Sequence, residues 1–162
     1  DLNSALEKND KSLFKDVIQR DEEVNRLYFL LVRQLRTIIQ NPSLQDKENI
    51  KAVDCVDYRF VVKIIELIGD NLHRSASVLL NKGLKDLSEI KKTSEQVFEI
   101  HKSAFEALIK KDPKLAAQAY EAHKKLKSKK LPSYKDERSD ILNNLIKIAD
   151  SGKDMADIVV FE

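Results

Sequence analysis

The feature that most constrains this 162-residue chain is its scarcity of residues that interrupt helices. Glycine and proline each occur only three times in the whole sequence. Because both residues disfavour helix interiors, their scarcity favours long helices joined by short turns. Aromatic residues, which favour β-strands, make up only 6% of the chain, and tryptophan is absent. The composition therefore predicts an all-α fold.

Apolar residues recur at helical spacing in five segments, each bounded by capping residues, proline or glycine. The predicted helices span residues 10–41, 43–80, 85–111, 113–129 and 134–160. The apolar stripes that should face inward include Leu27 and Leu31 in the first helix, Ile65 in the second and Phe105 in the third. All loops between them are short, so successive helices should pack as antiparallel neighbours.

Two pairs of segments show that the chain contains an internal repeat. Ala5-Leu-Glu-Lys-Asn-Asp10 matches Ala107-Leu-Ile-Lys-Lys-Asp112, and Ile65-Glu-Leu-Ile-Gly-Asp70 matches Leu145-Ile-Lys-Ile-Ala-Asp150. A small residue precedes the aspartate in both copies of the second segment, which suits close approach between helices. Each unit is expected to end one helix, form a hairpin and return along a long helix.

The repeat divides the chain into units at residues 1–82 and 83–162. In the second unit a whole helix, 85–111, leads up to the hairpin, whereas the first unit has only four residues ahead of its matching segment. We expect tandem three-helix bundles built from long antiparallel helices, the first lacking its leading helix through truncation. Such a unit exposes an apolar groove, to be filled by upstream residues or by a neighbouring chain.

Two carboxylates on the second predicted helix invite a cation. Glu66 and Asp70 are four residues apart, so they lie side by side on one helical face and repel each other. His73 follows on the same face, while Asp21 and Asn25 lie on the preceding antiparallel helix. An oxygen-rich set with one imidazole suits Fe, Zn, Mn or Mg and does not choose among them. These five residues form the predicted metal site.

An alternative interpretation of this face needs no metal. Lys63 is three residues from Glu66, and Arg74 is four residues from Asp70. Both spacings allow ion pairs along one helix, and an exposed face with such weak pairs is common on helical proteins.

Four stretches carry a family resemblance. They are the Ala-Leu-x-x-x-Asp segment ending at Asp10, Val17-Ile-Gln-Arg-Asp21-Glu-Glu-Val-Asn25-Arg-Leu27, Asp57-Tyr-Arg59 and Ile65-Glu66-Leu-Ile-Gly69-Asp70. Together they resemble the PhoU family of phosphate-uptake regulators, strongly over residues 5–80 and weakly over 100–160. The resemblance implies two tandem three-helix bundles in a cytoplasmic accessory protein, which couples a phosphate transporter to a sensor kinase and represses the phosphate-starvation response. It also implies acidic motifs on adjacent helices that bind metal ions, and in some relatives fusion to a small DNA-binding domain.

The chain departs from the family pattern at three positions. Asn25 stands where the family favours aspartate, Ile146 stands opposite Glu66, and His123 falls near the position that matches Asp21. The second unit therefore lacks paired carboxylates, and a metal site is expected in the first unit only.

These observations predict a protein-binding adaptor without enzymatic activity. By the resemblance, its partners are a phosphate transporter component and/or a sensor kinase, and the exposed groove favours a homodimer. The alternative is a structural helical dimerisation module of a larger transcriptional regulator, without ligand.

The charge and apolar patterns bear on nucleic acid and membranes. Because the net charge is only +2, we expect no direct contact with nucleic acid. No apolar run approaches the ~20 residues of a membrane span, and the single cysteine fits a cytoplasmic, reducing setting.

Four further features receive predictions of their own. His101 is expected to be a hydrogen-bonded core or edge residue, His123 a surface residue, and Cys55 a packed small apolar residue. The basic run Lys124-Lys-Leu-Lys-Ser-Lys-Lys130 has two interpretations. It is either a basic helix end that complements the helix dipole or a docking patch for an acidic partner.

Overall fold

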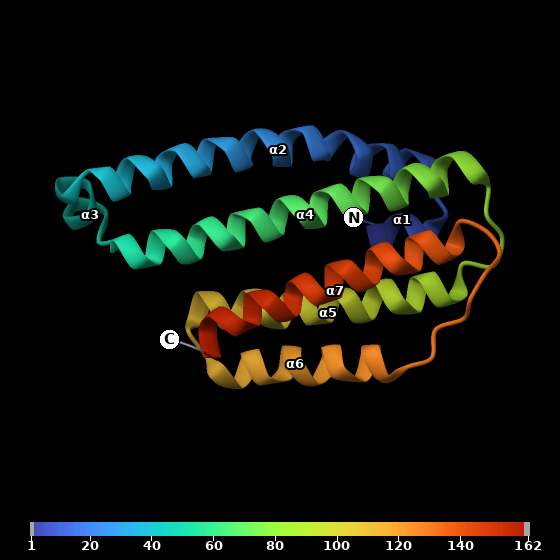
Figure 1. The fold of residues 1–162 in the computed structure, drawn as a ribbon. Helices are drawn as coiled ribbons and strands as arrows, with labels where there is room; N and C mark the ends of the chain where they lie inside the picture. The colour runs from blue at the N-terminus through green and yellow to red at the C-terminus, as the bar shows by residue number, and fades with distance from the viewer. Residues whose placement is uncertain (1, 161–162) are drawn as a thin grey trace.

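The computed structural model describes residues 2–160, and these form seven α-helices and no strand (Figure 1). The helices are α1 (Leu2–Lys8), α2 (Lys11–Gln40), α3 (Pro42–Glu48), α4 (Ala52–Lys82), α5 (Ser88–Lys110), α6 (Pro113–Ser128) and α7 (Arg138–Val160). The all-α prediction is confirmed.

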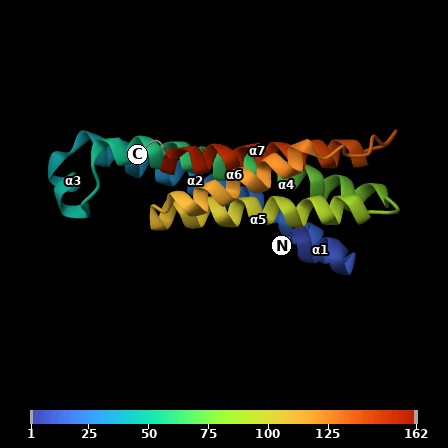
Figure 2. The ribbon, with the colours of Figure 1, turned by 90° about the horizontal axis from the view of Figure 1, so that it is seen from below.

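The helices form a long hairpin beside a three-helix bundle. Helices α2 and α4 run antiparallel, with the short α3 at their tip, while α5, α6 and α7 pack against one another (Figure 1). Helix α4 also packs against α7, which joins the two parts. Helix α1 contacts both α2 and α5 and lies on the same side of the molecule as α5 (Figure 2).

The hairpin predicted from the repeat occurs twice with matching geometry. Asp10 and Asp112 each accept a hydrogen bond from the backbone N–H two residues further on, at 2.8 Å in both cases. The preceding residues, Asn9 and Lys111, both adopt the left-handed conformation, with φ of 48° and 50°. The backbone N–H of each aspartate bonds the carbonyl of the alanine five residues earlier, at 3.1 Å. Helix α1 thus matches the last turns of α5, and α2 and α4 match α6 and α7.

The second unit is tightly packed because small residues line its helix contacts. Ala104 and Ala107 of α5 and Ala116 and Ala119 of α6 are completely buried. A Cβ atom on Gly152 of α7 would lie 2.9 Å from a methyl group of α5, so only glycine fits there without movement. These residues let the backbones approach closely and exclude water.

Two predicted helix boundaries were wrong. The segment predicted as one helix over 43–80 is two helices, α3 and α4. The break occurs because Asn49 takes the left-handed conformation (φ 50°), and the backbone N–H of Lys51 is then bonded by the Asp54 carboxylate at 2.7 Å, which begins α4. The last helix begins at Arg138 rather than near residue 134.

Four apolar residues predicted to face inward are exposed. Leu27 and Leu31 of α2, Ile65 of α4 and Phe105 of α5 have exposed fractions of 40–48%. Helical spacing locates the apolar side of a helix, but it does not show which residues at the edge of that side a neighbouring element covers. Val61 and Ile64 of α4, beside Ile65, are buried in a cluster with residues of α5, α6 and α7.

Candidate functional site

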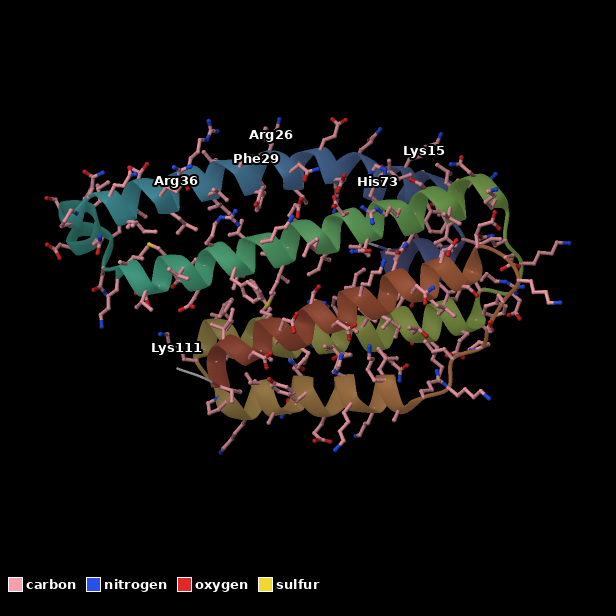
Figure 3. The ribbon with its side chains drawn as sticks, in the orientation of Figure 1. Lys15, Arg26, Phe29, Arg36, His73 and Lys111 are labelled. Carbon is pink, nitrogen blue, oxygen red and sulfur yellow. The ribbon has the colours of Figure 1, made fainter. Side chains whose placement is uncertain are left out.

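Three of the predicted site residues meet in the seam between α2 and α4, where Figure 3 labels His73. His73 Nδ1 lies 3.3 Å from Asp21 Oδ2, and the Asn25 side-chain amide donates to the same oxygen at 3.5 Å. Gly69 permits this close approach, since a Cβ there would lie 3.2 Å from both Asp21 Oδ1 and a methyl group of Val24. The predicted role of a small residue before Asp70 is confirmed.

The Asp21 carboxylate in this seam is incompletely satisfied. Its side chain is only 14% exposed, and its Oδ1 atom has no hydrogen-bond partner among the described residues. His73 Nδ1 is close enough for an ion pair but is not aligned to make a hydrogen bond. A partly buried carboxylate oxygen without a donor is costly. The seam therefore favours an added cation or proton donor beside Asp21.

Glu66 and Asp70 do not join this group, because each faces a cation of its own helix. Lys63 Nζ is hydrogen-bonded to Glu66, which raises the pKa of Lys63. Arg74 lies 4.0 Å from Asp70. In residues 2–160, no three or more His, Cys, Asp or Glu side chains are grouped so that they could hold a metal ion. The five predicted residues thus separate into a seam set and an ion-paired set.

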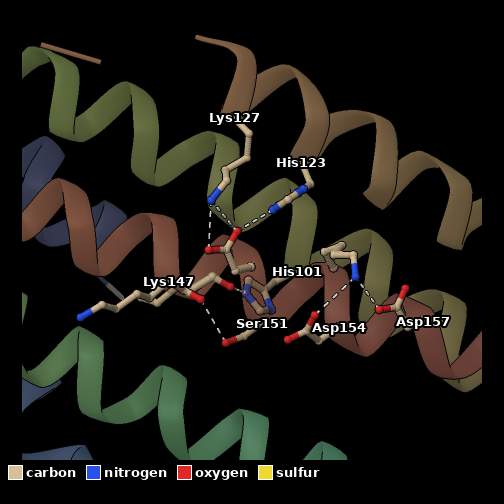
Figure 4. A network of polar contacts seen from close by, with 10 residues as sticks. His101, His123, Lys127, Lys147, Ser151, Asp154 and Asp157 are labelled. Carbon is tan, nitrogen blue, oxygen red and sulfur yellow. Dashed lines mark hydrogen bonds and ion pairs between the residues drawn. The ribbon is translucent and has the colours of Figure 1, made fainter. Parts of the chain in front are cut away.

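A polar network occupies the matching position in the second unit (Figure 4). His123 Nε2 lies 2.7 Å from Asp150 Oδ1, and Lys127 Nζ lies 3.1 and 3.2 Å from the two oxygens of the same carboxylate. Burial tends to raise the pKa of Asp150, but hydrogen bonds from His123 and Lys127 outweigh it, and the pKa is lowered.

The prediction that His123 is a surface residue was wrong. Its side chain is only 16% exposed, because α6 packs it against α7. By the repeat, His123 matches Asp21 and Asp150 matches Asp70. In the first unit Asp21 meets His73 rather than Asp70, so the repeat indicates the neighbourhood of the contact but not the pair itself.

The predictions for His101 and Cys55 are confirmed. His101 Nε2 lies 2.5 Å from the carbonyl oxygen of Ile148, across the contact between α5 and α7 (Figure 4). Burial lowers the pKa of His101, against the effect of that hydrogen bond. Cys55 is fully buried, and burial raises the pKa of its thiol. Neither residue is placed as a nucleophile or a metal ligand.

The basic run at the end of α6 is partly used inside the second unit. Lys127 pairs with Asp150, and Lys129 pairs with Glu89 of α5. These contacts support the interpretation of the run as a basic helix end, and they leave a docking role only to the other lysines of the run.

Residues 1–79 match the family model of the PhoU domain. The first unit of the chain is a PhoU domain. The match covers the first unit up to the last turn of α4, including the seam and the Glu66–Asp70 pair, while α5, α6 and α7 lie outside it. Comparison with curated proteins and with solved structures gives no match.

The PhoU domain supports a general role in phosphate homeostasis, since proteins of the PhoU family are regulators rather than enzymes and interact with phosphate transport proteins. Across the described part of the chain, no helix combines the length and the apolar character that a bilayer span requires.

Proposed function

We propose that this protein is a cytoplasmic adaptor in phosphate-starvation signalling. It binds a component of the phosphate transporter, a sensor kinase or both, and relays the state of one to the other. The PhoU domain match over residues 1–79 carries this proposal. The sequence contains no glycine-rich phosphate loop, so we place phosphate sensing in the partner rather than in this chain.

The distal α2–α4 hairpin supports a protein-binding role. It exposes Leu27, Leu31 and Ile65, and Leu31 also lines a hollow of about 300 Å³ together with Leu35 and Val61. Contiguous exposed apolar surface of this kind is typical of interaction sites. The same surface favours the second candidate function, a structural dimerisation module without ligand, and in either case we propose a homodimer.

A metal ion at the seam is a separate part of the proposal. Asp21 Oδ1 and His73 Nδ1 lack hydrogen-bond partners among the described residues, so they are two available donors. As arranged, they do not complete a metal site with Glu66 and Asp70, which pair with Lys63 and Arg74. We propose that Fe, Zn, Mn or Mg binds when the two carboxylates exchange these cations for the metal, with Asn25 as a further oxygen ligand.

The adaptor function is tested in cells that lack the gene. Deletion should switch on a phosphate-starvation reporter in phosphate-rich medium, because the repressing signal from transporter to kinase is lost. A plasmid copy of the wild-type gene should restore repression. Leu31→Glu, which places a charge on the exposed hairpin, should restore it poorly, whereas the matched control Phe105→Glu on α5 should restore it fully. An unchanged reporter after deletion would exclude the adaptor function.

The metal site is tested by elemental analysis of protein purified without chelator. We expect about one metal ion per chain, lost in Glu66→Ala/Asp70→Ala and retained in Asp150→Ala at the matching position of the second unit. Wild-type protein without metal would remove this part of the proposal and leave the dimerisation module without ligand as its simplest form.

A further inference from the structure

The outer face of the second half of α2 carries a cluster of arginines in an acid-free stretch. Between Glu23 and Asp46 the sequence has no acidic residue, but it contains Arg26, Arg33 and Arg36. The chain as a whole is nearly balanced, with a net charge of +2. Positive charge is therefore concentrated on this part of one helix.

These arginines share a single helical face with two large apolar residues. At about 100° per residue, Arg26, Phe29, Leu30, Arg33 and Arg36 fall within about 120° of one another. The residues are all exposed, with Phe29 at 62%. The stripe extends for about 15 Å at ~1.5 Å per residue. Figure 3 labels Arg26, Phe29 and Arg36 along α2. We call these five residues the arginine face.

The fold does not use the charges of the arginine face. None of its three guanidinium groups makes a hydrogen bond, an ion pair or a ring contact with another described residue. Other arginines of the chain are engaged, since Arg59 lies over the ring of Tyr28 and Arg138 pairs with Asp136. Three unpaired arginines around an exposed phenylalanine have no structural task in α2.

We propose that the arginine face binds an acidic protein segment, with carboxylates spaced to meet the arginines and an apolar residue that covers Phe29. Arginine and aromatic residues are enriched at the centres of protein interfaces, and guanidinium groups bind carboxylates in pairs of hydrogen bonds. The inference rests on the adaptor function proposed above and adds the chemistry of the partner.

Two other polyanions fit the arginine face less well. A nucleic-acid site needs a wider basic footprint, and the sequence pI of about 8.5 is below that typical of such domains. A helix that lies on an anionic membrane separates its basic residues from its apolar face, whereas here Phe29 and Leu30 lie among the arginines. An acidic segment with an apolar residue matches both parts of the face.

The test uses a displayed library of random 16-residue peptides, selected on the purified protein. Peptides that bind should be enriched in Asp and Glu around a leucine or an aromatic residue. Their affinity should fall at least tenfold in Arg26→Glu/Arg33→Glu/Arg36→Glu and in Phe29→Ala, and it should weaken as salt is raised. The control Lys124→Glu/Lys125→Glu/Lys130→Glu, which we call the α6 lysine variant, makes the same change in net charge on α6 and in the loop that follows it, and should bind as wild type does.

Three outcomes would overturn the proposal. They are selected peptides without acidic enrichment, equal binding by the arginine variant that circular dichroism shows to be folded, and equal loss in the α6 lysine variant. Arginine-dependent binding to a 20-base-pair DNA duplex or to phosphatidylserine vesicles, without selection of acidic peptides, would also reassign the face.

The starvation reporter separates this inference from the adaptor function. If deletion of the gene activates the reporter but the arginine variant represses it as well as wild type does, the adaptor function stands and the arginine face is not its docking surface. If deletion has no effect, the adaptor function fails, and the peptide selection alone decides the chemistry of the arginine face.

Discussion

Each unit pairs an imidazole with a carboxylate across its last two long helices, but the two residue types come from the helices in opposite order. In the first unit the carboxylate of Asp21 comes from α2 and the imidazole of His73 from α4. In the second unit the imidazole of His123 comes from α6 and the carboxylate of Asp150 from α7. Asp21 and His123 occupy matching positions, but His73 matches Lys153 and Asp150 matches Asp70. The two contacts therefore lie about one helical turn apart on the last helix of each unit.

The units differ in how the carboxylate is satisfied. Lys127 adds a cation beside Asp150, whereas the matching residue in the first unit is Asn25, which makes only a long contact to Asp21. The second unit neutralises its carboxylate internally, and the first leaves an oxygen without a donor among the described residues. The unit with the incomplete site is also the one that matches the PhoU domain.

The two units also differ in the burial of apolar side chains, as another matched pair of positions shows. Leu145 of α7 is 1% exposed, and its counterpart Ile65 of α4 is 40% exposed. Leu145 packs in a cluster with apolar residues of α5, whereas Ile65 lies beside Val61 and Ile64, which make the buried contact of α4 with the second unit. The second unit should therefore supply most of the stability of this chain.

The largest expected effect compares these two positions. Leu145→Ala should lower the free energy of unfolding by about 2–5 kcal/mol, because it leaves a cavity in a closed core. Ile65→Ala should cost about 1 kcal/mol or less, since its side chain is already partly in water. Urea unfolding followed by circular dichroism measures both. Equal losses would show that the apolar face of the first unit is covered in solution, as in a dimer, and sedimentation would then detect that dimer.

A smaller difference is expected between two helical glycines. In Gly152→Ala the new methyl group would meet Ile100 at 2.9 Å and His101 at 3.1 Å, both in a packed core. Overpacking should outweigh the gain in helix propensity and cost about 1–2 kcal/mol net. In Gly69→Ala the nearest atoms, 3.2 Å away, belong to the side chains of Asp21 and Val24, so clash and propensity should nearly cancel.

Thermal melts of the two alanine variants, compared with wild type, measure this difference. A Gly69→Ala variant less stable than Gly152→Ala would mean that the seam around Asp21 is the more rigid of the two contacts. The comparison between an open first unit and a closed second unit would then be wrong at this position.

Local patterns explain why most of the fold could be predicted from the sequence. Helix spacing and capping residues are encoded within a few positions, and Asp10 and Asp112 form the predicted caps at both hairpins. The break at Asn49 was not predicted, because the sequence does not show whether an asparagine continues a helix or ends it in the left-handed conformation. The exposure of Leu31 also escaped, because periodicity does not show which elements cover a face.

The candidate site could be predicted only in part for a related reason. Proximity within one helix follows from spacing, and Glu66 and Asp70 do share a face with Lys63 and Arg74. Contacts between helices depend on their register, which spacing alone does not supply. The pair of His123 and Asp150 does not follow from the repeat, because the corresponding contact of the first unit joins Asp21 to His73, one turn further along the last helix.

The smallest expected effect is the acid dependence of stability. It tests directly how each unit satisfies its buried or partly buried carboxylate. The lowered pKa of Asp150 means that its ionised form stabilises the folded state. This contribution is fully present above the unfolded pKa of about 3.9 and is lost as the pH falls through the lower, folded value. Since the Asp150 side chain is 43% exposed, solvent screening limits the contribution to about 0.5–1 kcal/mol.

Asp150→Asn should therefore destabilise the protein at pH 7 but not at pH 2, so the two unfolding curves converge in acid. Asp21→Asn should change the unfolding free energy at pH 7 by less than about 0.5 kcal/mol, because His73 is not aligned to stabilise its charge. Urea titrations at a series of pH values separate the two variants. A gap between wild type and Asp150→Asn that persists at pH 2 would show that Asp150 acts through packing rather than charge. A pH-dependent loss in Asp21→Asn as large as that in Asp150→Asn would show that the first unit, too, satisfies its carboxylate from within.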